Sequence, residues 1–108
     1  MSNSITTYQE NTLDLTVQII DIDKETINFS GYTAIMAINT VISKIYITGS
    51  TITTGGTTTF IISSEKNNLK PDVYEYEIYL NKHTNNYTNN YTVIKDSYTV
   101  LSRPSYLD

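Results

Sequence analysis

The sequence has no cysteine and a single histidine, His83. Without cysteine, no disulfide framework can form, and no thiolate can serve as a nucleophile or a metal ligand. One histidine is too few for a zinc site built on several His or Cys side chains, or for a histidine-rich active site. These absences exclude thiol enzymes and zinc proteins of the usual kinds.

Positive charge is also scarce. Seven Lys and Arg residues stand against eleven Asp and Glu, which gives a net charge of -4. The seven are scattered along the sequence, so we expect no basic surface that could bind a phosphate backbone, and no nucleic-acid partner. Apolar runs are far shorter than a membrane span, and the polar residues 1–12 lack the basic-then-apolar order of a signal peptide. We therefore expect a protein that is made in the cytoplasm and has no membrane partner.

The residues that are abundant favour strands. Ile, Thr and Val make up 38 of the 108 residues, and ten tyrosines add to them. Such side chains fit a pleated, half-buried surface and lose rotamer freedom in a helix, so they predict an all-β domain. Charged residues make up only 17% of the chain. Sheet edges are therefore weakly guarded against pairing with neighbours.

Alternation of apolar and polar side chains predicts where the strands lie. Gly55 and Gly56 indicate a tight hairpin turn in which both residues could adopt positive φ. Residues 64–69 predict one helical turn. Residues 83–90 predict an exposed loop, and an Asn-Asn-Tyr-Thr duplication over 85–92 begins within it. The expected strands are 4–8, 13–21, 32–39, 44–48, 50–54, 57–63, 73–82 and 91–102, the last with an interruption near 95–97. Seven or eight short antiparallel strands of this spacing predict a sandwich or a small barrel.

The segment Leu69–Tyr74 (LKPDVY) is the most specific local signal. It resembles the tyrosine corner of Greek-key sandwiches, in which a buried tyrosine ties its hydroxyl to the backbone upstream. Asp72 stands where such corners often carry glycine, and aspartate tolerates the left-handed geometry better than most residues. We expect one sandwich domain over 1–108, with its core in about 5–102 and short terminal arms. The side chains expected in the core are Leu15, Val17, Met36, Phe60, Ile62, Tyr74, Tyr76, Ile78 and Val100.

Two groups of carboxylates are candidate chemical sites. Asp21, Asp23 and Glu25 alternate in one segment, and three oxygens at this spacing could chelate calcium. No glycine shapes that loop and the EF-hand spacing is absent, so a solvated turn is favoured. Glu75 and Glu77 could form an acid–base pair, but the period-2 pattern favours the outward face of a strand. We therefore expect no catalytic residue, no cofactor and no metal.

Four segments, taken in order, resemble a known family. The segments are 13–23, 29–34, 63–78 and 91–100. They are similar to the immunoglobulin-like N-terminal domain of the upper baseplate proteins of tailed phages. Phe29 and Ser30 depart from the leucine and threonine that precede the Gly-Tyr step of that family. The resemblance implies an immunoglobulin-like sandwich and a non-enzymatic adaptor, with no catalytic residues to carry over. It also implies a place in the virion at the tail, baseplate, head–tail junction or capsid surface.

This role implies docking residues on the surface of the domain. Other virion structural proteins are the expected partners, and a homo-oligomer in the particle is one form that docking could take. The expected docking residues are Arg103, Pro104, Tyr106 and Leu107 in the C-terminal arm, and Tyr87 and Tyr91 in the duplicated segment. The alternative is a carbohydrate- or host-surface-binding module that uses exposed tyrosines such as Tyr79, although no tryptophan is present. A hydrolase is least favoured, because one histidine without a nucleophile motif supplies no nucleophile–base pair.

Overall fold

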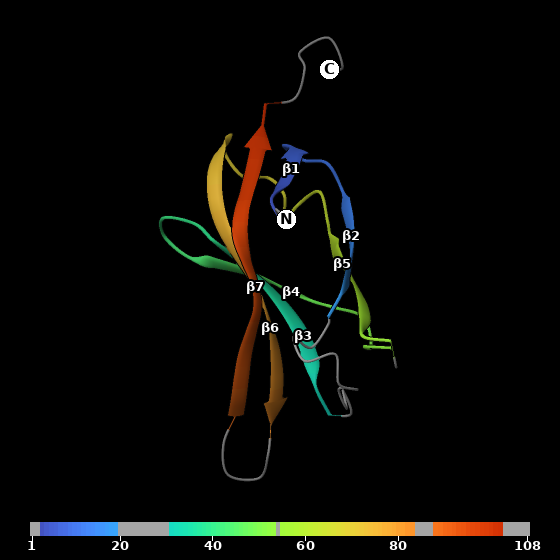
Figure 1. The fold of residues 1–108 in the computed structure, drawn as a ribbon. Coiled ribbons are helices and arrows are strands. Elements are labelled where there is room, and N and C mark those ends of the chain that lie inside the picture. Colours follow the sequence, from blue (N-terminus) through green and yellow to red (C-terminus); the bar gives the residue numbers. More distant parts are fainter. Residues whose placement is uncertain (1–2, 20–30, 54, 84–87, 103–108) are drawn as a thin grey trace.

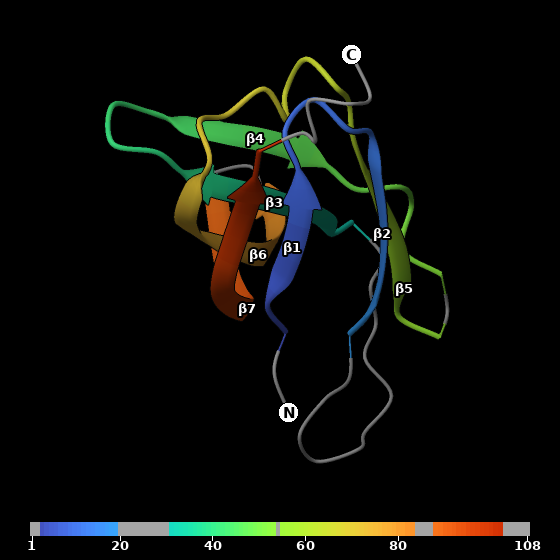
Figure 2. The same ribbon diagram turned by 90° about the horizontal axis from the view of Figure 1, so that it is seen from above.

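The computed structural model describes residues 3–19, 31–53, 55–83 and 88–102. These residues form an all-β sandwich without helices, and its seven strands are divided between two sheets (Figures 1 and 2). The predicted fold class is confirmed. The strands are β1 (Ile5–Tyr8), β2 (Leu13–Gln18), β3 (Thr33–Asn39), β4 (Lys44–Thr48), β5 (Thr57–Ile62), β6 (Asp72–His83) and β7 (Thr88–Leu101).

The two sheets differ in size. The large sheet has the strand order β1-β7-β6-β3-β4, and β2 pairs with β5 in the small one. Figure 2 shows the small sheet as a second layer beside the curled large sheet. The described strand pairs are antiparallel apart from β1, which runs parallel to β7. The expectation of antiparallel strands is wrong for β1, because no hairpin joins it to β7 and tertiary contacts alone set its direction.

Two predicted boundaries are also wrong. Residues 50–53 form no strand, although Ser50 N donates to Thr59 O over 2.9 Å. The predicted loop at 83–90 is shorter than expected, because β6 continues to His83 and β7 begins at Thr88. Cross-strand pairing sustains this extension, and Asn81 Nδ2 donates to Asn90 Oδ1 at 2.7 Å. The β6–β7 hairpin consequently extends beyond the small sheet (Figure 1).

Two predicted turns are present. Asn67 N donates to Ser63 O at 2.9 Å, which closes the single turn expected near 64–69. In the turn after residue 53, Gly56 N donates to Thr53 O at 2.9 Å. Only Gly56 of the glycine pair has a positive φ, of 85°. The expectation that Gly55 could share this conformation is therefore not met.

The core lies between the two sheets. Of the nine residues predicted there, six are buried: Met36, Phe60, Ile62, Tyr76, Ile78 and Val100. The other three, Leu15, Val17 and Tyr74, are half-buried and pack against this cluster. The alternation in β3, β5 and β6 thus identifies the buried face correctly, since period-2 spacing places alternate side chains on one side of a sheet.

Gly49 is the point at which the chain crosses from the large sheet to the small one. Its N–H donates to Ala34 O on β3 at 2.8 Å, and the next residue, Ser50, bonds to β5. A Cβ at Gly49 would lie 2.6 Å from Thr58 Oγ1 and 3.0 Å from the Phe60 ring. The close approach of the two sheets therefore requires glycine at this position.

A buried asparagine joins three parts of the chain that are far apart in sequence. The Asn67 side chain is fully buried, and its Nδ2 donates to Tyr8 O at 3.1 Å and to Asn11 O at 2.8 Å. Its Oδ1 accepts the Tyr98 hydroxyl at 2.6 Å. Glu10, between the two carbonyls, has a positive φ of 66° and donates its N–H to Asn67 O at 3.1 Å. The turn at 63–67, the end of β1 and strand β7 are thereby held together.

The tyrosine corner is confirmed by its hydrogen bond. The Tyr74 hydroxyl donates to Lys70 O at 2.7 Å, four residues upstream. The ring is half-buried rather than buried, so the corner lies at the margin of the core. Tyr76, two residues further along β6, donates its hydroxyl to Asn3 O and packs edge-on against Tyr98, with ring centroids 6.5 Å apart.

Phe60 tests the location of the core. Its side chain is fully buried, whereas the next residue, Ile61, is 62% exposed. We expect Phe60→Ala to lower the free energy of unfolding by about 3–5 kcal/mol, because it removes buried contacts and leaves a cavity. Ile61→Ala should cost less than about 1 kcal/mol. Urea denaturation measures both, and equal losses would contradict the assignment of the buried face.

The buried phenol of Tyr98 should make the protein less stable at alkaline pH. Burial raises the pKa of Tyr98 from 10.0 to about 12. Below pH 10 the phenol is protonated in both states, so its contribution is fully present. Between pH 10 and about 12 the unfolded chain loses this proton while the folded protein keeps it, so stability falls. Urea midpoints measured across this range should fall less steeply in Tyr98→Phe, and identical slopes would argue against a buried phenol.

Candidate functional site

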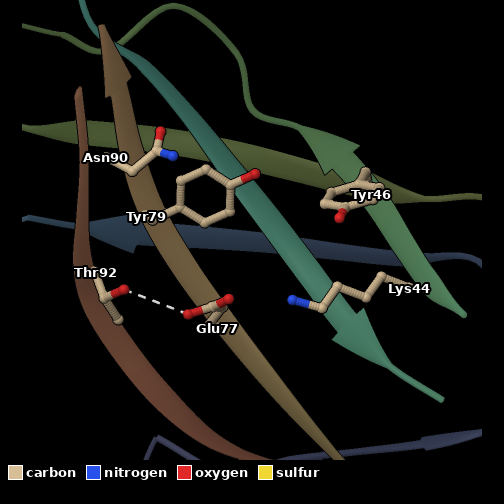
Figure 3. A pocket seen from close by; sticks show the side chains of 6 residues that line it. All are labelled: Lys44, Tyr46, Glu77, Tyr79, Asn90 and Thr92. Atoms are coloured by element: carbon tan, nitrogen blue, oxygen red, sulfur yellow. Dashed lines mark hydrogen bonds between the residues drawn. The ribbon is translucent and has the colours of Figure 1, made fainter. Parts of the chain in front are cut away.

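The outer face of the large sheet, away from the small sheet, carries a hollow of about 250 Å³. We call it the outer-face depression; strands β4, β6 and β7 line it (Figure 3). Strand β3 lies between β4 and β6, and its Ala37 is paired with Tyr46 on one side and Glu77 on the other. Ala37 is small and only 1% exposed, so its larger neighbours rise on both sides of it. The residues that line the depression are Lys44, Tyr46, Glu77, Tyr79, Asn90 and Thr92.

A β-bulge decides which side chains of β7 face the depression. Ile78 pairs with Ile94, but Tyr79 pairs with Thr92, so Val93 is the extra residue in β7. The alternation of β7 is therefore shifted by one residue in the part of the strand that precedes Val93, and the side chains there lie on the opposite face from the one that regular alternation would give them. Thr92 and Asn90 therefore line the depression beside Tyr79. Without the bulge, Val93 would take this face.

The two tyrosines of the depression differ in burial. Tyr46 is 52% exposed, whereas Tyr79 is half-buried. Burial raises the pKa of the Tyr79 phenol above its ordinary value, and the neighbouring Tyr46 and Glu77 raise it further. The Tyr79 hydroxyl is therefore neutral near pH 7 and can both donate and accept a hydrogen bond.

The depression carries one positive and one negative side chain, Lys44 and Glu77. Figure 3 shows the Lys44 ammonium and the Glu77 carboxylate in the same depression. Thr92 Oγ1 donates to Glu77 Oε2 at 3.3 Å. No ion pair joins Lys44 to Glu77 in the part of the chain that the structure describes. An ion pair forms instead on the same sheet between Lys95 Nζ and Glu75 Oε1, at 3.4 Å. The prediction that Glu75 and Glu77 form an outward polar face is confirmed.

A second feature is the tip of the β3–β4 hairpin, residues 40–43, which projects from the side of the sandwich (Figures 1 and 2). Thr40 N donates to Ser43 O at 2.8 Å, and Ser43 N donates to Thr40 Oγ1 at 3.0 Å. Between them, Val41 is 97% exposed and Ile42 is 93% exposed. Turns favour Gly, Asn, Asp, Pro and Ser, so two aliphatic β-branched residues at such a position have no local structural reason. The tip thus presents apolar surface on a backbone fixed by hydrogen bonds.

A third feature is a hollow of about 290 Å³ between the edges of β1 and β2. Ile5, Leu15, Val17 and Ile94 contribute apolar lining. Among the described strands, β1 pairs only with β7 and β2 only with β5, so each has one edge without a neighbour. Edges of this kind can accept an added strand.

Of the predicted docking residues, the structure describes only Tyr91. Tyr91 is 52% exposed, and its ring packs edge-on against Tyr32, with centroids 6.2 Å apart. Tyr91 lies on the opposite face of β7 from Asn90 and Thr92 and does not line the depression. The others, Tyr87, Arg103, Pro104, Tyr106 and Leu107, lie outside the described residues, as do Asp21, Asp23 and Glu25.

Two features of the site were missed at the level of sequence. The presence of Tyr46 and Tyr79 in one depression depends on the register of β4 and β6 against β3, for which the sequence carries no local signal. The Val41–Ile42 tip had a signal, because Thr-Val-Ile-Ser separates two predicted strands.

Within the described ranges, no three His, Asp or Glu side chains are grouped as they would be around a metal ion. The same ranges contain no helix that could span a membrane.

Comparison with known proteins places the fold. No protein-family model and no curated protein sequence matches the chain. The structure is similar to the N-terminal domain of phage TP901-1 ORF48, with a TM-score of 0.64 and 13% sequence identity. The match covers 93% of this chain and 84% of that one. At this identity the likeness concerns the fold, so the chain has the fold of a phage protein domain.

Proposed function

We propose that the chain is a non-enzymatic structural protein of a tailed-phage virion that docks on other virion proteins. The observation that carries the proposal is the fold shared with a phage protein domain over 93% of the chain. The four segments that resemble the immunoglobulin-like domain of phage upper baseplate proteins support it from the sequence. In this proposal the sandwich is immunoglobulin-like, and its place is the tail, baseplate, head–tail junction or capsid surface.

The β3–β4 tip is the docking element that the described residues favour. Val41 and Ile42 expose nearly all of their apolar surface to water, and burial in an apolar pocket of a partner would recover that free energy. The turn is already held by Thr40 and Ser43, so docking would cost little conformational entropy. The tip therefore has the two properties of an anchor: apolar area and a fixed shape.

The C-terminal arm is a second proposed contact, argued from sequence alone. Pro104 would restrict the backbone of the arm, and Tyr106 and Leu107 would be its apolar anchors. Such an arm could add a strand to the open edge of a neighbouring sheet, where backbone hydrogen bonds supply affinity. Arg103, Tyr87 and Tyr91 complete the proposed contacts.

The direct test is quantitative mass spectrometry of purified virions from cells that supply a tagged copy of the chain. The wild-type chain should be present at a constant ratio to a coat protein. The double variant Val41→Ser/Ile42→Ser should enter particles roughly tenfold less, because an anchor is lost. Its melting temperature should be unchanged, because both side chains are exposed in the free protein.

Ile61→Ser is the matched control for the tip. Ile61 is also an exposed aliphatic residue, at 62%, but it lies on β5 away from the tip. This variant should enter particles at the wild-type ratio. Absence of the wild-type chain from virions would refute the proposed function, whereas normal entry of the double variant would refute only the role of the tip.

Deletion of residues 103–108 tests the arm. The truncated chain should fold with nearly the wild-type melting temperature, because β7 ends at Leu101 and the buried core lies within residues 5–100. It should fail to enter particles if the arm docks. Incorporation of the truncated chain at the wild-type copy number would move the contact to the tip, the sheet edges or the segment around Tyr91.

A further inference from the structure

We propose that the outer-face depression binds a neutral saccharide. This small-molecule site on the outer face of the large sheet is separate from the docking role, which concerns contacts with proteins. Two tyrosines, Tyr46 on β4 and Tyr79 on β6, line the depression on either side of strand β3. Aromatic rings offer an apolar surface to the C–H face of a sugar, and their hydroxyls meet its polar rim. The alternative function predicted from exposed tyrosines is thereby assigned to this depression, although Tyr79 itself is half-buried rather than exposed.

The charges of the depression favour a ligand without net charge. Lys44 and Glu77 bring one positive and one negative group to the same depression and do not form an ion pair with each other. An anionic ligand would meet the Glu77 carboxylate, and a cationic ligand would meet the Lys44 ammonium. A polyhydroxylated neutral molecule, by contrast, can accept from Lys44 and donate to Glu77 at the same time.

The hydrogen-bonding groups of the depression are only partly used within the protein. Glu77 Oε2 accepts from Thr92, and Asn90 Oδ1 accepts from Asn81. Among the described residues, no bond is found for Glu77 Oε1, Asn90 Nδ2 or the Tyr79 hydroxyl. Acceptor, amide donor and hydroxyl together match the alternating donors and acceptors of sugar hydroxyl groups. The existing bonds to Thr92 and Asn81 hold the Glu77 and Asn90 side chains in position for a ligand.

The site rests on a rigid base. Its residues lie on strands of one continuous sheet, in which β3 is hydrogen-bonded to both β4 and β6. The bulge at Val93 provides Thr92 and Asn90, which a regular strand would have turned to the other face. Bulges often re-aim side chains beside binding sites, and this one assembles half of the polar lining.

The experiment is a titration of the isotopically labelled protein, followed by amide NMR shifts. The probes are the methyl glycosides of glucose, galactose, rhamnose and N-acetylglucosamine, with methyl phosphate as an anionic control. At least one glycoside should shift amides on β4, β6 and β7 around the depression in a saturable manner. Methyl phosphate should not. No saturable shift with any glycoside, or shifts confined to other strands, would overturn the proposal.

Variants separate the proposed contacts from general effects. Tyr79→Ala and Asn90→Ala should each weaken binding by roughly tenfold, whereas Tyr79→Phe should retain most of it. Tyr8→Ala is the control, because Tyr8 is an exposed tyrosine, at 43%, on β1 outside the depression. Asn90 is exposed, so Asn90→Ala gives a folded variant even if Tyr79→Ala is unstable. Unchanged affinity in Asn90→Ala and in folded Tyr79→Ala would contradict the site.

A surface polysaccharide and a free sugar share this chemistry, so the soluble polysaccharide of the host envelope is titrated as a separate arm. Tighter binding of the polymer than of its constituent glycoside would identify a surface glycan as the source, and equal affinity would identify the single sugar unit. Both outcomes support the site. Because these measurements use the isolated chain, their failure leaves incorporation into virions untouched, and the two proposals can fail separately.

Discussion

The buried amide of Asn67 is the interaction on which the closure of this sandwich depends. One side chain bonds to the backbone at Tyr8 and Asn11 and to the hydroxyl of Tyr98. These contacts fix the end of β1, the turn into β2 and the C-terminal part of β7 relative to the 63–67 turn. A buried amide must have its bonds satisfied, since leaving its partners unpaired costs about 1–3 kcal/mol each. The parallel placement of β1 on β7 follows from this geometry rather than from any hairpin.

The large sheet serves two purposes through its two faces. Its inner face carries Met36, Tyr76, Ile78 and the other side chains that pack against the small sheet. Its outer face carries the depression, whose tyrosines and charges have no packing role in the core. The bulge at Val93 connects the two, because it keeps Ile94 turned inward while it moves Thr92 outward. A single extra residue thus maintains the core and builds the polar half of the site.

The proposed docking surfaces that the structure describes are groups that the free protein leaves uncovered. The chain has few charges, and its described edges at β1 and β2 have no neighbour in the sheet. The hairpin tip adds two aliphatic side chains on a turn fixed by Thr40. Apolar anchors and open strand edges are exposed to water in the free protein. They stabilise a complex when a partner covers them. A structural component of a larger particle, with the fold of a phage domain, fits these properties.

The sequence by itself determined the fold class, the buried faces of β3, β5 and β6, and the hydroxyl bond of Tyr74. These follow from periodicity and from contacts between residues close in the chain, which local physics decides. Tertiary structure alone decided that residues 50–53 leave the ladder after Gly49, that β6 and β7 extend into the predicted loop, and that Asn67 is buried. It alone placed Tyr46 beside Tyr79 and turned Asn90 outward. Each of these depends on register and on the partner strand, and a shift of one residue in pairing reverses every side chain without changing the local pattern.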